Sequence, residues 1–119
     1  MTSSLTDKVV ALTTVGSREQ ATHIAEELIG RHLAACVNIV PAVRSIYRWK
    51  GKVWDDEEYL LVIKSTRARF DALRDAIQSL HSYELPEVIA MPVSDGDAGV
   101  LDWIARSVEP PASAPAAKG

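Results

Sequence analysis

The stretch VRSIYRWKGKVWDDEEYLLVIKS, residues 43–65, predicts a long β-hairpin. Two runs rich in β-branched and aromatic residues flank the pair Lys50–Gly51, which suits a tight turn. A turn centred there predicts which residues oppose one another: Trp49 and Lys52, Arg48 and Val53, Tyr47 and Trp54, Arg44 and Glu57. The acids after the turn therefore face the bases before it, and each opposed pair contributes about 0.2–1 kcal/mol.

The segments around this hairpin predict an α+β domain. Strands are expected at KVVALTTV (8–15), LAACVNIV (33–40, interrupted by Pro41) and VIAMPV (88–93). A helix follows Ser17, which forms a capping box with Gln20, and its apolar residues recur at helical spacing: Ala21, Ile24, Ala25, Leu28 and Ile29. A second helix is expected over 67–81. A short last helix, carrying Val100, Leu101 and Ile104, is expected after Asp97, which would cap it. The order β-α-β-β-α-β plus a terminal helix is that of a ferredoxin-like sandwich, with both main helices on one face of an antiparallel sheet.

The bulk properties of the chain indicate one ordinary globular domain. The 119 residues include 47% hydrophobic and 24% charged side chains, with a net charge of −3. That charge argues against a nucleic-acid partner, because phosphate contacts require a basic excess. No apolar run reaches the roughly 18 residues of a membrane span, and the start MTSSLTDK has no apolar signal region. A single cysteine, Cys36, suits a reducing compartment, so we expect a cytoplasmic protein.

The aromatic residues of the hairpin have two interpretations. Aromatics between cations can stack on single-stranded RNA, but the acids after the turn cancel the positive field that such a platform needs. Tyr47, Trp49 and Trp54 lie where a small core cannot reach, so we expect a second copy of the chain to cover them. Contact between subunits is the favoured interpretation.

Several blocks of the chain resemble the CutA family of divalent-cation tolerance proteins: LAACVNI (33–39), SIYRWKGKV (45–53), LHSYELPEVIAMPV (80–93) and VLDWI (100–104). The resemblance implies a ferredoxin-like protomer, similar to the PII signalling proteins, in a tight homotrimer. It supports a CutA-type domain at 8–107. We expect the start (1–7) to be flexible and the Pro/Ala-rich tail (108–119) to be disordered, because PPASAPAAKG has no large apolar residue. Two departures stand out: Ser82 replaces the proline of the family's LHPYE, and the first strand carries no thiol.

The candidate metal ligands are His81, Cys36 and Glu84. Imidazole with carboxylate suits Zn²⁺ or Cu²⁺, and thiolate suits copper(I), so weak binding of Cu²⁺ or another divalent cation is expected. In the alternative, His81 caps the C-terminus of its helix, and Cys36 belongs to the core. His23 and His32, nine residues apart on the first helix, are expected at the surface.

Signals for an enzyme are weak. The chain has no GxSxG, P-loop or GxGxxG pattern. The resemblance implies an inter-subunit cleft that Lys64, Tyr83 and Glu87 would line. The leading hypothesis is a homotrimeric, non-enzymatic protein of divalent-cation tolerance, and the alternative is a PII-like sensor that holds a small anion in this cleft.

Overall fold

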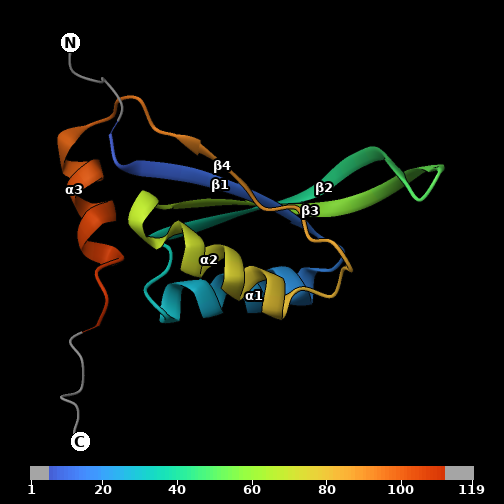
Figure 1. The fold of residues 1–119 in the computed structure, drawn as a ribbon, viewed down its shortest axis with the longest axis horizontal. Coiled ribbons are helices and arrows are strands. Elements are labelled where there is room, and N and C mark those ends of the chain that lie inside the picture. The colour runs from blue at the N-terminus through green and yellow to red at the C-terminus, as the bar shows by residue number, and fades with distance from the viewer. Residues whose placement is uncertain (1–5, 112–119) are drawn as a thin grey trace, which may run out of the picture.

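The computed structural model describes residues 6–111, which form one antiparallel four-stranded sheet and three helices (Figure 1). The elements are β1 (Lys8–Val15), α1 (Arg18–Gly30), β2 (Cys36–Trp49), β3 (Lys52–Thr66), α2 (Arg67–Leu80), β4 (Ile89–Pro92) and α3 (Ala98–Ser107). The strand order is β2-β3-β1-β4. The predicted α+β, ferredoxin-like class with an additional C-terminal helix is confirmed. None of the described helices is both long and apolar enough to cross a membrane.

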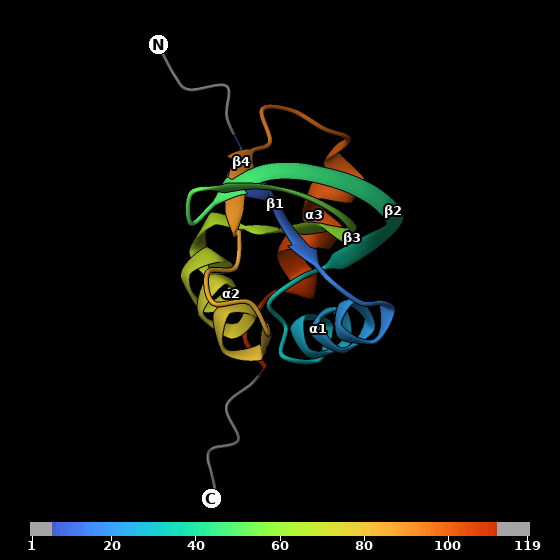
Figure 2. The same cartoon turned by 90° about the vertical axis from the view of Figure 1, so that its right-hand side faces the viewer.

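The core lies between the sheet and the two helices α1 and α2, which cover the same face of the sheet (Figures 1 and 2). Alternate residues of β1 and β3 point into this layer, and the apolar faces of both helices close it. The largest fully buried apolar side chains are Ile24, Leu28, Leu61, Ile63, Leu73, Ile77 and Val15. The opposite face of the sheet has no α1 or α2 over it.

Both predicted helix caps exist, although one is simpler than expected. The Ser17 hydroxyl accepts a hydrogen bond of 3.1 Å from the backbone N–H of Gln20, and Asp97 accepts one of 3.1 Å from Val100. The prediction that Gln20 completes the capping box is wrong, because its side-chain amide donates instead to the Leu80 carbonyl, 3.4 Å away. That contact joins the start of α1 to the end of α2.

The predicted hairpin register is confirmed at every opposed pair, from Trp49 with Lys52 to Arg44 with Glu57. The ion pair of Arg44 is diagonal, however, and joins it to Asp55 at 2.6 Å rather than to Glu57. Diagonal neighbours on one face of a ladder lie within reach of long side chains. The hairpin extends beyond the layer of helices (Figure 1).

The start of β2 and its proline differ from expectation. β2 begins at Cys36, and Leu33 and Ala34 are buried before it. Pro41 does not end the strand, because β2 is at the edge of the sheet, where a missing N–H is tolerated. The irregularity is instead a register shift between Val40 and Val43, with Ala42 in the left-handed region at φ 61°.

The folded unit extends slightly past the predicted boundaries at 8 and 107. The Thr6 hydroxyl donates a hydrogen bond of 2.8 Å to the Val93 carbonyl, and Val108, which ends α3, is 2% exposed. α3 lies across the end of the sheet opposite the hairpin (Figure 1). Residues 1–5 and 112–119 of the two predicted tails lie outside the described residues.

Candidate functional site

A groove opens between the hairpin and the loop that follows α2, with a cavity volume of about 670 Å³. β1, β2, β3 and this loop all contribute side chains to it. The groove is lined by Thr14, Arg44, Ser45, Ile46, Tyr47, Trp49, Asp56, Glu58, Tyr83, Glu84, Leu85 and Glu87. Aromatic, apolar and acidic side chains therefore share one concave surface, as is typical of small-molecule sites.

Glu58 and Tyr83 form a polar contact within the groove lining. The residue Glu58 is 5% exposed, and its carboxylate accepts a hydrogen bond of 2.6 Å from the Tyr83 phenol. Burial, followed by this hydrogen bond, raises the pKa of Tyr83 above its ordinary value, so the phenol stays protonated. Gly16 allows the close approach of the ring, because a Cβ at that position would lie 3.1 Å from the Tyr83 oxygen.

A second phenol–carboxylate pair lies on the hairpin. The Tyr47 hydroxyl donates a hydrogen bond of 2.5 Å to Asp56. This bond is the main reason that the pKa of Tyr47 rises to about 12, with partial burial as the next cause. Side chains alternate along a strand, so Asp56 and Glu58 lie on the same face of β3, and both line the groove.

The basic side chains near the groove are already paired. Arg44 binds Asp55 through two hydrogen bonds of 2.9 and 2.6 Å. At the hairpin turn, the Lys50 ammonium lies 3.0 Å from Glu84 and 5.6 Å from the centre of the Trp49 ring. The lining therefore combines four carboxylates, of which Glu84 is held by Lys50, with one guanidinium that is held by Asp55, and the remaining three carboxylates favour a cationic ligand.

His81 has a structural position. Its Nε2 lies 2.7 Å from the Thr14 carbonyl oxygen, and its Nδ1 accepts a hydrogen bond of 3.1 Å from the backbone N–H of Tyr83. This arrangement requires the neutral tautomer with hydrogen on Nε2, which donates to Thr14. The residue is 9% exposed, its ring joins the end of α2 to β1, and both ring nitrogens have hydrogen-bond partners.

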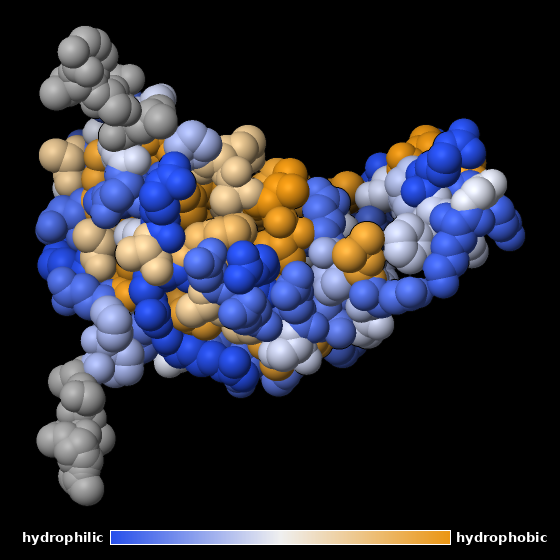
Figure 3. All heavy atoms as spheres, in the orientation of Figure 1, coloured by the Kyte–Doolittle hydropathy of each residue, from blue (hydrophilic) through white to orange (hydrophobic). Residues whose placement is uncertain are grey.

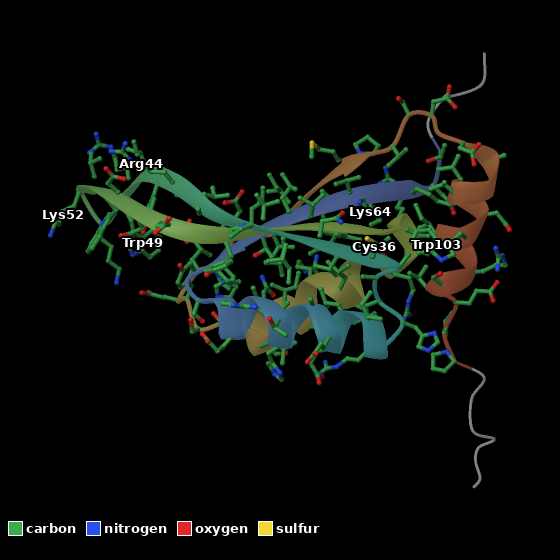
Figure 4. All side chains as sticks on the ribbon, turned by 180° about the vertical axis from the view of Figure 1, so that it is seen from behind. Cys36, Arg44, Trp49, Lys52, Lys64 and Trp103 are labelled. Carbon is green, nitrogen blue, oxygen red and sulfur yellow. The ribbon has the colours of Figure 1, made fainter. Side chains whose placement is uncertain are left out.

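The three predicted metal ligands lie apart within one chain. His81 contacts Thr14 and Tyr83, Glu84 pairs with Lys50, and Cys36 is at the other end of β2, where its thiol contacts Asn38 at 3.7 Å. Figure 4 shows Cys36 and Lys64 at the end of the sheet opposite Trp49 and Lys52. Among the described residues, no three His, Cys, Asp or Glu side chains are grouped closely enough to hold an ion.

The other predictions for cysteine and histidine were partly wrong. Cys36 is half-buried and lies outside the core, because its neighbour Val37 takes the face toward the helices. His23 is exposed on α1, as expected. His32 does not belong to that helix, which ends at Gly30, and its backbone is in the left-handed region at φ 59°.

The predicted cleft residues divide into two groups. Tyr83 and Glu87 line the groove. Lys64 lies far along β3, opposite Cys36, and its ammonium binds the Asn38 side-chain oxygen. Within one chain Lys64 therefore does not join the other two, and a cleft containing all three requires a second copy.

Two of the three hairpin aromatics are exposed in the single chain. Tyr47 is 39% and Trp54 38% exposed, while Trp49 is half-buried. The Trp54 indole N–H donates a hydrogen bond of 3.0 Å to the Trp49 carbonyl. Sequence reasoning missed Asp56 and Glu58 as groove residues. Their spacing of two within the run DDEE was the available signal, because it places both on one face of a strand.

The chain matches a family model and several known proteins. The model described as CutA1 divalent ion tolerance protein matches residues 9–107. The divalent-cation tolerance protein CutA of Thermus thermophilus is 47% identical over 95 residues, which cover 80% of this chain and 92% of that protein. Human protein CutA is 41% identical over 99 residues, and the match spans 83% of this chain but only 55% of the human protein.

Solved structures show the same fold. The structure of the divalent cation tolerance protein from Thermus thermophilus has a TM-score of 0.84 at 44% identity and covers 86% of this chain and 99% of that chain. The Oryza sativa CutA1 structure has a TM-score of 0.84 at 40% identity, with 90% and 98% covered. Sequence, topology and these matches agree, and the chain belongs to the CutA1 divalent ion tolerance protein family.

Proposed function

We propose that this protein of divalent-cation tolerance is a self-associating binding protein whose groove receives a positively charged ligand. The observation that supports this most directly is the charge of the lining. Asp56, Glu58 and Glu87 contribute carboxylates outside any ion pair of the described residues, whereas Glu84 is held by Lys50 and the one guanidinium, that of Arg44, is held by Asp55. A concave site with this balance attracts cations and repels anions. The same balance disfavours the anion-sensing alternative.

Direct binding of Cu²⁺ or another divalent cation is one form that this function takes, and we propose that it is weak. Carboxylate oxygens suit hard divalent ions, and His with carboxylate suits Zn²⁺ or Cu²⁺. Because no group of three such side chains forms within the described part of one chain, an ion would need ligands from two copies. His81 would have to give up a hydrogen bond to become one of them.

We further propose that the protein is a homotrimer held together by the sheet face opposite α1 and α2. The sheet register places apolar residues side by side on this face: Val10, Leu12, Leu60, Val62, Ile89 and Met91. Ile89 is 49% and Met91 46% exposed in the single chain, and apolar side chains gather over the middle of the molecule (Figure 3). Exposed apolar faces of this kind mark contact with other proteins. Tyr47, Trp49 and Trp54 on the extended hairpin would add to the contact.

Light scattering after gel filtration tests the assembly. The expected mass is three times the 13.0 kDa of one chain. Val62→Lys places a charge in the middle of the proposed interface and should shift the protein to smaller species. Ala72→Lys on the exposed side of α2 is the matched control and should leave the mass unchanged. A folded wild-type particle of 13.0 kDa at micromolar concentration would refute the trimer.

Isothermal titration tests the charge preference of the groove. Wild-type protein is titrated with CuCl₂, ZnCl₂, an organic diammonium salt and inorganic phosphate, and each is repeated with Glu58→Gln. We expect heat from at least one cation, weakened in Glu58→Gln, and none from phosphate. Specific binding of phosphate in the absence of cation binding would overturn the proposal and restore the anion-sensing alternative.

We also propose that the protein is not an enzyme and works in the cytoplasm. The two groove phenols donate to carboxylates and stay protonated, so neither is a ready nucleophile or base. The single cysteine, half-buried and free, is compatible with a reducing compartment. Turnover of a groove ligand, detected by mass spectrometry after incubation, would contradict the non-catalytic role.

A further inference from the structure

We propose that Lys64 of a neighbouring copy is the cationic partner of Glu58, so that each groove is completed only in the assembled protein. This pairing rests on the proposed self-association of the chain. It adds the polar contact that fixes how one copy sits on the next, and it gives Lys64 a place in the groove that this residue does not have within one chain.

Glu58 is a carboxylate that the single chain buries without a cation. The residue is 5% exposed, and removing a carboxylate from water is costly unless a cation accompanies it. Its carboxylate accepts a hydrogen bond from the neutral phenol of Tyr83. None of the ion pairs in the described part of the chain includes Glu58. Because Glu58 is one of the groove-lining residues, a cation that enters the groove comes close to it.

Lys64 is the converse case, an ammonium group without a carboxylate. The residue is half-buried, and its Nζ binds the side-chain oxygen of Asn38, which is a neutral group. The other described lysines and arginines are exposed or ion-paired, with the exception of Arg69. Arg69 belongs to α2, on the helix side of the sheet, where it donates to the His32 carbonyl. Lys64 is therefore the half-buried cation of the described sheet that still lacks an anion.

Lys64 and Glu58 lie on the same face of β3, because an even number of positions separates them and side chains alternate along a strand. This face is the one opposite α1 and α2, and Leu60 and Val62 lie on it between the two charges. A strand rises about 3.3 Å per residue, so roughly 20 Å separates Lys64 from Glu58 within one chain. The face is thus negative near the hairpin and positive at the other end of the sheet, where Figure 4 shows Lys64.

A face with opposite charges at its two ends is complementary to a second copy of itself. When copies are arranged head to tail, the Lys64 end of one meets the Glu58 end of the next, and the contact repeats until the ring closes. The apolar side chains between the two ends are buried in the same step, and the paired charges fix the orientation. Asp56 and Glu87 remain outside this pair and available to a ligand of the groove.

Cross-linking with a water-soluble carbodiimide tests the pair in the wild-type protein. This reagent joins an ammonium group directly to a carboxylate, with no spacer between them, so the two groups must be in contact. We expect mass spectrometry of the digested product to find a peptide pair joined through Lys64 and Glu58. The two residues are too far apart to be linked within one chain, so the product should also appear as a covalent multimer on a denaturing gel.

Sedimentation of a dilution series tests the contribution of the pair to assembly. Lys64→Met and Glu58→Gln should each raise the concentration at which half of the assembly dissociates by about thirtyfold or more. Lys64→Arg keeps the charge and should assemble much more tightly than Lys64→Met. The double variant should be no weaker than the weaker single variant, because both changes remove the same contact. Arg18→Met is the matched control, since Arg18 is an exposed cation of α1 with no ion pair among the described residues, and it should assemble like the wild type.

Three results would overturn the pairing. Wild-type assembly in Lys64→Met, with no link between Lys64 and Glu58, would remove the pair and leave both the trimer and the cation-binding groove in place. Additive losses in the double variant would show that the two residues make separate contacts. A folded wild-type particle of 13.0 kDa would remove the self-association and the pair together, whereas cation binding by the groove, measured by titration, would stand or fall independently.

Discussion

The phenol of Tyr83 and the carboxylate of Glu58 lie 2.6 Å apart, although 25 residues separate them in the chain. The bond connects the loop after α2 to the middle of β3, and both residues line the groove. Gly16, directly after β1, lies close to the same phenol, since a Cβ added there would be 3.1 Å from its oxygen. Three segments that are distant in sequence therefore meet at one hydrogen bond, and its loss should be measurable in both stability and binding.

Tyr83→Phe should destabilise the protein by about 1–3 kcal/mol, because it leaves the buried Glu58 carboxylate without its donor. Urea unfolding at fixed protein concentration measures the change. Tyr59→Phe is the control, since no hydrogen bond of the Tyr59 hydroxyl is present in the described structure, and it should change stability by less than about 0.5 kcal/mol. Equal effects in the two variants would mean that the Tyr83–Glu58 bond contributes nothing specific.

Gly16→Ala should displace the Tyr83 ring. The added methyl would lie 3.1 Å from the phenol oxygen, tighter than ordinary van der Waals contact, so we expect a loss of about 1 kcal/mol. Gly30→Ala at the end of α1 is the matched control, because nothing lies within 4 Å of its new Cβ. That helical position should gain up to about 1 kcal/mol instead. Thermal unfolding should show a lower melting temperature for Gly16→Ala and a higher one for Gly30→Ala. An unchanged melting temperature in Gly16→Ala would show that the Tyr83 ring moves aside freely.

Alkaline pH should weaken the fold in a window set by Tyr47. The hydrogen bond to Asp56 raises the pKa of Tyr47 to about 12 from the ordinary 10.0. Between these values the folded state keeps the proton and the unfolded state loses it, so stability is complete below about pH 10 and falls as pH rises through the window. Tyr83 shifts in the same direction. Unfolding measured against pH should show this decline, and Tyr47→Phe should make it shallower. Ultraviolet absorbance of the wild type should show phenolate from Tyr47 only near pH 12.

His81→Ala should cost stability without affecting metal binding. The variant removes both hydrogen bonds of the ring, to the Thr14 carbonyl and from the Tyr83 N–H. We therefore expect the free energy of unfolding to fall by about 2–4 kcal/mol. His23→Ala on the exposed side of α1 should stay within about 0.5 kcal/mol of the wild type. Titration with Cu²⁺ should give the same affinity before and after the His81 change. A clear loss of Cu²⁺ affinity in a folded His81→Ala protein would return this residue to the set of metal ligands.

The sequence predicted the local features of this fold because they depend on neighbours in the chain. The apolar spacing of α1, the Asp97 cap and the register set by the Lys50–Gly51 turn all follow from side chains within a few residues of one another. The predictions that were wrong depended on the position of distant segments. The Gln20 amide donates to the Leu80 carbonyl instead of completing the capping box, and Pro41 does not end β2, because β2 is at the edge of the sheet.

The amino-acid sequence by itself therefore determined the order of strands and helices and the hairpin register. Through its resemblance to relatives it also determined the family. Only the tertiary structure decided which polar groups meet. In the folded chain both nitrogens of His81 have hydrogen-bond partners, and Lys64 lies far from Tyr83. Glu58 is buried against the Tyr83 phenol, with no cation beside it in the described part of the chain. The physical reason is that backbone periodicity is a local property, whereas burial and pairing of a charge depend on elements that converge only after the sheet has formed.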